Sequence, residues 1–106
     1  MKIVGVAACI TGVAHTYMAQ EAIEQECKKR GYDVKVETQG GMGIENELSE
    51  DEIAEADVVI LAIAIGIEGV ERFEEKEDAG LVISLNPAEV VREPAAIIDR
   101  AEKLAK

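Results

Sequence analysis

The sequence has 106 residues, a length that suits one compact domain. Hydrophobic residues make up 48% of it and aromatic residues 3%, so the core must be aliphatic and needs neither disulfide bonds nor a structural metal. The formal net charge of −11, with no basic patch, argues against binding to nucleic acid. No apolar run approaches the roughly 20 residues that span a bilayer, and the amino terminus lacks the cleavage site of a signal peptide. We therefore expect a cytoplasmic protein without a membrane insertion.

The first two predicted elements are a strand and a helix. Residues 2–8 are rich in valine and alanine and nearly uncharged, as in a strand buried on both faces. Residues 14–30 have helical spacing that places Met18, Ala22 and Ile23 on one side. The basic run at residues 28–30 and the glycine that follows predict the carboxyl end of this helix.

The middle of the chain repeats this alternation. Residues 33–39 alternate as a strand, which the glycine-rich residues 40–43 interrupt. Ser49 and Glu52 form a capping-box pattern that predicts a short helix ending near Ala56. Residues 57–65 are the most apolar run, which we interpret as the central strand.

The last third begins with residues 69–77, which we expect to form a loop with a helical turn. Residues 80–85 predict a fourth strand, and residues 93–106 a closing helix. Pro87 and Pro94 fit the first turns of helices. The backbone N–H that proline lacks would have no hydrogen-bond partner within the helix at that position.

Strands that alternate with helices favour parallel βαβ units with helices on both faces of the sheet. We therefore predict a single α/β domain over residues 1–106, with a Rossmann-like three-layer sandwich. Its four-stranded parallel sheet has the order 2-1-3-4, with strands numbered along the chain. Ligands of such sheets bind outside the carboxyl ends of the strands, where the strand order reverses. Cys9, at the end of the first strand, would lie at that point.

Two cysteines and one histidine, His15, do not give the ligand spacing of a zinc site, so we expect no metal and no cofactor. A disulfide bond is also not expected in a reducing cytosol. Cys27 lies at the edge of the inward face of the predicted first helix, and packing is its expected role.

Cys9 stands between a strand and the amino terminus of a helix, where backbone N–H groups converge and the helix dipole is positive. This arrangement binds anions and lowers the pKa of a thiol, which makes the cysteine nucleophilic. We predict thiolate attack on phosphorus at Cys9, and a phosphate-binding loop formed by Ile10, Thr11, Gly12, Val13, Ala14, His15 and Thr16. The alternative is a buried structural cysteine at the end of a strand.

Position 15 separates two classes of phosphate chemistry. A thiol phosphatase needs an arginine six positions after its cysteine to bind the transition state in a bidentate manner, and this chain has His15 there. A phosphoryl carrier must hold the group without rapid hydrolysis. The sequence thus favours a carrier over a low-molecular-weight phosphatase or an arsenate-reductase-like enzyme. A regulatory module whose phosphorylation is recognised by another protein is a third hypothesis.

The sequence of residues 9–19, Cys-Ile-Thr-Gly-Val-Ala-His-Thr-Tyr-Met-Ala, resembles the phosphorylation loop of the fructose-family IIB components of the bacterial sugar phosphotransferase system. Further matches are Val-Glu-Thr-Gln-Gly at residues 36–40, Gly-Ile-Glu-Asn-Glu-Leu at 43–48 and Glu-Arg-Phe at 71–73. The resemblance extends over nearly the whole chain. It departs from the family at Ile10, where relatives have proline, and at Ala64, where they often have aspartate.

This resemblance implies a phosphoryl relay. A phosphohistidine of a IIA partner would phosphorylate Cys9, which would then phosphorylate a sugar bound by the membrane permease IIC. The protein would thus be a phosphotransferase for fructose or a fructose-like sugar, attached to the inner membrane only through IIC. The first and last residues favour a free-standing subunit. Ile10 restores a backbone N–H next to Cys9, and we expect the phosphate loop to form nonetheless.

Other residues have two interpretations. His15 either stabilises the phosphoryl group or hydrogen-bonds the loop backbone. Thr38 and Gln39 either line the site or contact a partner, or else Gly40 and Gly41 beside them serve only the turn. Arg72 is expected to pair with Glu68 or Glu75.

Overall fold

The computed structural model describes residues 1–8, 13–40 and 43–105. Its five strands form one sheet in the order β3-β2-β1-β4-β5. The strands are β1 (Lys2–Ala8), β2 (Asp33–Gly40), β3 (Gly43–Glu45), β4 (Val58–Ile63) and β5 (Val82–Leu85). Four of them are parallel, and β3 runs antiparallel to β2.

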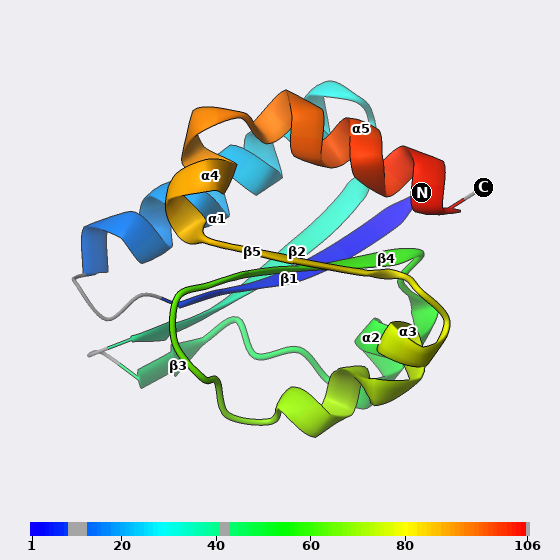
Figure 1. The fold of residues 1–106 in the computed structure, drawn as a ribbon, viewed down its shortest axis with the longest axis horizontal. Coiled ribbons are helices and arrows are strands. Elements are labelled where there is room, and N and C mark those ends of the chain that lie inside the picture. The colour runs from blue at the N-terminus through cyan, green and yellow to red at the C-terminus, as the bar shows by residue number, and fades with distance from the viewer. Residues whose placement is uncertain (9–12, 41–42, 106) are drawn as a thin grey trace.

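Helices cover both faces of the sheet, so the molecule has three layers (Figure 1). One layer consists of α1 (Val13–Lys29), α4 (Pro87–Arg92) and α5 (Pro94–Ala105). The other contains α2 (Glu50–Glu55), the 3₁₀ helix η1 (Val70–Phe73) and α3 (Glu74–Asp78). The predicted α/β class with a three-layer sandwich is confirmed.

The sheet differs from the prediction in one strand. The four predicted strands have the predicted order, because β2, β1, β4 and β5 are neighbours in that sequence. The fifth strand, β3, was missed because its three residues are exposed and include a glycine, so they have no apolar alternation. With β3 added, β1 and not residues 57–65 is the middle strand.

The inward face of α1 was predicted only in part. Ala19, Ile23 and Cys27 are fully buried against the sheet, with a spacing of four residues. Met18 was expected on that face, but its side chain is 47% exposed. Helical spacing alone could not decide which of two adjacent apolar residues faces the sheet.

The predicted helix signals are present. The hydroxyl of Ser49 accepts a hydrogen bond from the N–H of Glu52, and the Glu52 carboxylate accepts one from the N–H of Ser49. Pro87 and Pro94 occupy the first positions of α4 and α5. Residues 69–77, expected to be a loop with a helical turn, form η1 and most of α3.

The core is divided by the sheet into two aliphatic clusters, one under each helical layer. Gly5 on β1 permits the close approach of β4, because a β-carbon there would lie 2.8 Å from the carbonyl oxygen of Ile60. No helix within the described residues is long and apolar enough to cross a membrane.

Candidate functional site

The carboxyl ends of β1, β2, β4 and β5 meet at one edge of the sheet, on the left in Figure 1. The chain leaves β1 toward β2 on one side and later returns to β4 on the other side. The carboxyl end of β1 is therefore the point where the strand order reverses, which is the usual ligand-binding position in such sheets. β1 ends at Ala8, and α1 begins at Val13. The predicted Cys9, Ile10, Thr11 and Gly12 lie between them, outside the described residues.

The remaining four predicted phosphate-binding residues open α1: Val13, Ala14, His15 and Thr16. The His15 side chain is exposed, whereas Thr16 is only 3% exposed. The Thr16 hydroxyl has no hydrogen-bond partner among the described residues. Buried hydroxyl groups are nearly always paired, because an unpaired one costs about 1–3 kcal/mol. The Thr16 hydroxyl is thus a buried polar group near the start of α1 that has no partner within the described part of the chain.

Cys27, the other cysteine, lies far from this edge in the fold. It is fully buried in the apolar cluster beneath α1. Burial, aided by the negative charge of Glu26, raises the pKa of the Cys27 thiol to about 12. The thiol is thus protonated and inert near neutral pH, which agrees with the predicted packing role.

Behind the same edge, on the face covered by α2 and η1, lies a buried ion pair between Glu37 of β2 and Arg72 of η1. Guanidinium nitrogens lie 2.9 and 3.0 Å from the two carboxylate oxygens of Glu37. The Glu37 side chain is fully buried, and that of Arg72 is 13% exposed. Arg72 was expected to pair with Glu68 or Glu75. That prediction was wrong, because the packed layers bring Arg72 to Glu37, which lies 35 positions earlier in the chain.

The ion pair has no unmet hydrogen-bonding capacity. All five N–H groups of the guanidinium can be assigned, two to Glu37 and three to the carbonyl oxygens of Leu48, Glu68 and Gly69. The carboxylate of Glu37 also accepts hydrogen bonds from the N–H of Leu48 and from the side chain of Gln39. Burial raises the pKa of Glu37, but these hydrogen bonds outweigh burial, and the net pKa lies below its ordinary value.

Gln39 extends this network to the chain that leaves β4. Its side-chain N–H₂ group donates to the carbonyl oxygen of Glu68 at 3.0 Å, and its side-chain oxygen accepts from the Glu68 N–H at 2.8 Å. We refer to Glu37, Gln39 and Arg72 together as the brace. The sequence leaves Gln39 as a candidate for lining the site. The structure instead gives it a bidentate contact with a backbone, while its own side chain is 8% exposed.

The sequence predicted neither the ion pair of Glu37 with Arg72 nor the contact of Gln39 with the backbone of Glu68. The residues were nevertheless visible in the sequence, because Glu37 and Gln39 lie in the second matched motif and Arg72 in the third. What the sequence could not show is that Arg72 pairs with Glu37, which lies 35 positions away. A buried, apolar environment around a predicted strand glutamate is the signal that could have indicated a distant cation.

On the opposite face of the sheet, α1 is connected to the edge strand. The hydroxyl of Tyr17 donates a hydrogen bond to the carboxylate of Glu45 in β3. Glu45 lies directly across from Thr38 in the register of β2 and β3. This contact fixes the first turns of α1 relative to the β2–β3 pair.

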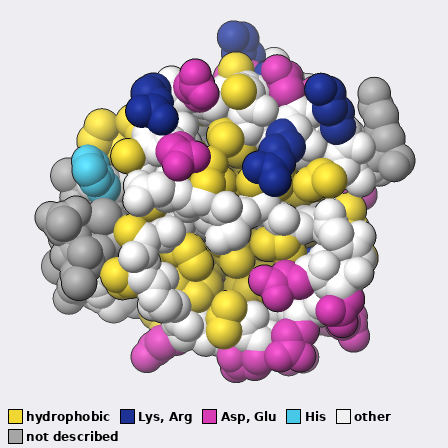
Figure 2. Space-filling model, in the orientation of Figure 1, with side chains coloured by type: hydrophobic (Ala, Val, Ile, Leu, Met, Phe, Trp, Pro, Cys, Tyr) yellow, Lys and Arg dark blue, Asp and Glu magenta, His cyan; other side chains and the backbone are white. Residues whose placement is uncertain are grey.

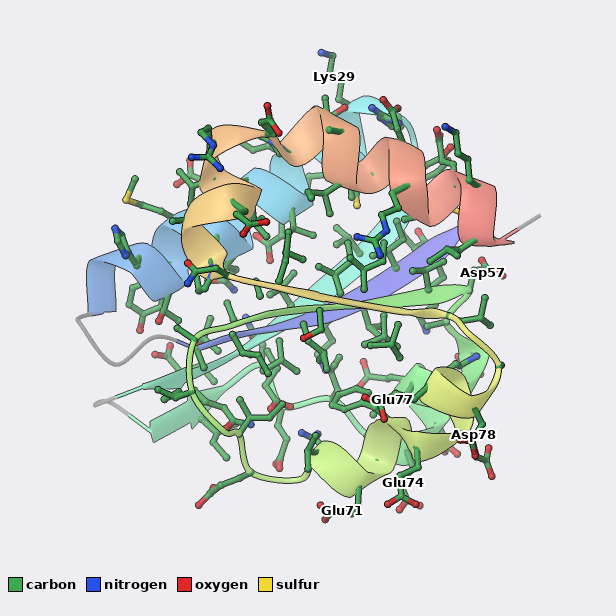
Figure 3. The ribbon with its side chains drawn as sticks, viewed as in Figure 1. Lys29, Asp57, Glu71, Glu74, Glu77 and Asp78 are labelled. Atoms are coloured by element: carbon green, nitrogen blue, oxygen red, sulfur yellow. The ribbon has the colours of Figure 1, made fainter. Side chains whose placement is uncertain are left out.

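Acidic side chains are frequent on the surface of the layer of α2, η1 and α3, although this layer also contains Arg72 and Lys76. In the view of Figure 2, described Lys and Arg side chains lie over the layer of α1, α4 and α5, whereas the layer of α2, η1 and α3 shows acidic ones only. Figure 3 shows Glu71, Glu74 and Asp78 of η1 and α3 pointing away from the sheet. A protein that contacts this acidic layer must present a basic or neutral surface. The described residues contain no cluster of His, Cys, Asp or Glu suited to a metal ion.

These features define a class of protein, a three-layer α/β domain whose middle strand leads to its first helix at the point where the strand order reverses. The family model for the lactose/cellobiose-specific IIB subunit of the PTS system matches residues 4–100. The chain belongs to this IIB family of the sugar phosphotransferase system.

Individual relatives point to its fructose-like branch. The chain is 48% identical over 101 residues to the PTS system fructose-like EIIB component 2 of Escherichia coli, which covers 95% of this chain and 92% of the relative. It is 51% identical over 72 residues to the fructose-like PTS system EIIBC component of E. coli, covering 68% of this chain and 15% of that protein. The crystal structure of a domain from the fructose-specific IIABC component of Borrelia burgdorferi superimposes with a TM-score of 0.85 at 47% identity, covering 94% of this chain and 91% of that domain.

Proposed function

We propose that residues 1–106 act as one IIB domain in which Cys9 carries a phosphoryl group from a IIA partner to a sugar. Family membership supports a role in the sugar phosphotransferase system. The observation that supports the position of the phosphoryl group is the buried hydroxyl of Thr16, which has no partner among the described residues. It lies in the first turns of α1, just after the point where the strand order reverses.

The proposed transfer has two steps. The Cys9 thiolate attacks the phosphorus of a phosphohistidine, so that an S–P bond forms while the N–P bond breaks and its electron pair returns to the imidazole. A sugar hydroxyl oxygen then attacks the same phosphorus and gives its proton to water, while the S–P bond breaks and its electron pair restores the thiolate. Backbone N–H groups at the start of α1 and the hydroxyl of Thr16 stabilise the negative oxygens in both steps. Ile10, Thr11, Gly12, Val13, Ala14 and His15 complete the proposed loop.

A carrier fits the charges around this edge better than a phosphatase does. Position 15 holds histidine, and Arg72 has all its donors committed to Glu37 and to backbone carbonyls. Arg72 therefore cannot serve as the bidentate group that a thiol phosphatase directs at its transition state. The phosphocysteine is held by backbone dipoles, which supply weaker stabilisation for attack by water.

The proposed partners follow from the family. One is a IIA protein or domain, and the other is the membrane permease IIC, which binds the sugar. The EIIBC relative, in which a segment similar to this chain belongs to a much longer protein, supports close contact with IIC. We propose a cytoplasmic location at the inner membrane through that contact. A fructose-like sugar is the proposed substrate, on the names of the relatives.

The proposal is tested by incubating the protein with phosphorylated IIA and weighing it by intact-protein mass spectrometry. We expect the gain of one phosphoryl group, which Cys27→Ser retains and Cys9→Ser loses. Transfer from phosphorylated Cys9 to sugar is then followed in membranes that contain IIC. Retention of transfer by Cys9→Ser would refute the assignment. Rapid turnover of a small phosphate ester without any partner would instead indicate a phosphatase.

A further inference from the structure

The brace is more extensive than a structural ion pair requires. Residues 64–69, which connect β4 to η1, have no helix or strand of their own and include two glycines. Four of the hydrogen bonds of the brace are formed with the backbone of Glu68 and Gly69 within this segment. These hydrogen bonds restrict the backbone of Glu68 and Gly69, in a segment where the glycines would otherwise allow several conformations.

The other end of the segment is tied to β1. The backbone N–H of Ala64 donates to the carbonyl oxygen of Ala8 at 3.1 Å. Ala8 is the residue immediately before Cys9. Residues 64–69 are thus fixed at one end to the strand that leads into the phosphoryl-carrying residue and at the other end to the brace.

Gly69 shows that the contact between this segment and Arg72 is closely fitted. Its φ angle is +72°, and a β-carbon placed on it would lie 2.6 Å from Nε of Arg72. Any other residue would be strained and would also push the guanidinium away from Glu37. The fit therefore depends on a glycine at this position and an arginine three residues later.

We propose that the brace is a positioning unit for phosphoryl transfer. It fixes residues 64–69 beside the carboxyl end of β1 and thereby forms one wall of the site at which Cys9 is phosphorylated. Glu37, Gln39 and Arg72 touch neither the phosphoryl group nor the sugar. This inference rests on the proposed function of Cys9, because it assigns the brace to that same site.

The test compares two brace variants with a matched control at the opposite end of the sheet. Arg72→Lys keeps the charge but cannot bind two oxygens and three carbonyls at once, and Gln39→Met removes the bonds to Glu68 at similar volume. The control is Arg30→Lys, because Arg30 also joins distant elements, the end of α1 and α5, through Asp99, Glu102 and the carbonyl of Ala95, and it binds Glu26 locally. Urea unfolding gives the stability of each variant, and rapid-quench single-turnover kinetics give the transfer from phosphorylated IIA.

We expect both brace variants to slow the first-order transfer step by about tenfold or more at saturating donor, with the half-saturating donor concentration changed by less than about twofold. The control should lose stability but keep the transfer step within about twofold of the wild type. In the wild type, the amide resonances of residues 64–69 should shift when Cys9 is phosphorylated.

The inference is overturned if the folded brace variants transfer at the wild-type rate, or if Arg30→Lys slows the step equally. If Arg72→Lys does not fold, Gln39→Met alone decides, because it leaves the ion pair in place. Cys9→Ser separates this inference from the proposed function. Transfer that survives in Cys9→Ser refutes the carrier, whereas transfer lost there but normal in the brace variants refutes only the positioning role.

Discussion

Arg72 binds both carboxylate oxygens of Glu37, at 2.9 and 3.0 Å, although 35 positions separate the two residues. Glu37 is fully buried, so removal of the cation would leave a charge in an apolar environment without its partner. The pair connects β2 to η1. The guanidinium of Arg72 also donates hydrogen bonds to the backbone carbonyl oxygens of Glu68 and Gly69, which connects the pair to the chain that leaves β4.

We predict that Arg72→Met lowers the free energy of unfolding by about 3–5 kcal/mol, the usual cost of breaking a buried pair from one side. The double variant Glu37→Leu with Arg72→Met should lose less, because no charge is left unpaired. Urea unfolding at pH 7 measures both. A double variant that is less stable than the single one would contradict this explanation.

Gly69→Ala should be more harmful than the same change at Gly31. Both glycines have positive φ angles, +72° and +77°, so each alanine carries a strain of about 1–2 kcal/mol. Only at position 69 would the new β-carbon collide with Arg72, because Gly31 has open space around it. Thermal or urea unfolding of both variants gives the difference. Equal losses would mean that Arg72 moves aside at no cost.

Glu52 predicts an acid-dependent loss of stability. Its hydrogen bonds from Lys35, at 2.8 and 2.9 Å, and from the backbone of Ser49 lower the pKa of the carboxyl group to about 2, from an ordinary value of 4.5. Because the folded pKa is the lower one, this stabilisation is complete above the ordinary value and is lost as the pH falls toward 2. The difference in unfolding free energy between the wild type and Glu52→Gln should therefore shrink between about pH 5 and pH 2. A difference that stays constant over that range would refute the assignment.

Cys27 should resist thiol reagents in the folded protein. Its pKa of about 12 and its full burial leave almost no thiolate at pH 8 and no access for a reagent. Iodoacetamide should modify one cysteine, Cys9, in buffer and both cysteines in urea, as mass spectrometry of the digested protein would show. Modification of Cys27 in buffer at the rate of a free thiol would contradict its place in the core.

A substitution at Thr16 should change stability and phosphoryl transfer in opposite directions. Thr16→Val keeps the shape and removes a buried hydroxyl that has no partner in the described structure, so stability should rise by about 1 kcal/mol. Phosphoryl transfer should fall by about tenfold, because we propose that the hydroxyl stabilises the anion. Thr16→Ser should keep most of the transfer rate. A valine variant with unchanged transfer would remove Thr16 from the site.

Much of the fold could be predicted because its signals are local. The apolar runs, the capping box at Ser49 and Glu52 and the two helix-opening prolines each depend on a few neighbouring residues, and the structure has all of them. β3 could not be predicted, since three exposed residues form a strand only because β2 lies beside them. The roles of Cys9 and of the residues up to Gly12 in phosphoryl transfer remain a prediction from the sequence. The evidence for these roles is the loop motif.

The sequence alone determined the class of fold, the family and the cysteine proposed to carry the phosphoryl group. These follow from periodicity and from a motif whose residues are adjacent in the chain. Only the tertiary structure decided that Met18 faces solvent, that Arg72 belongs to Glu37 and that Gln39 binds the backbone of Glu68. The physical reason is that a buried charge or amide takes whichever partner the packed layers bring within 3 Å, and distance along the chain does not restrict that choice.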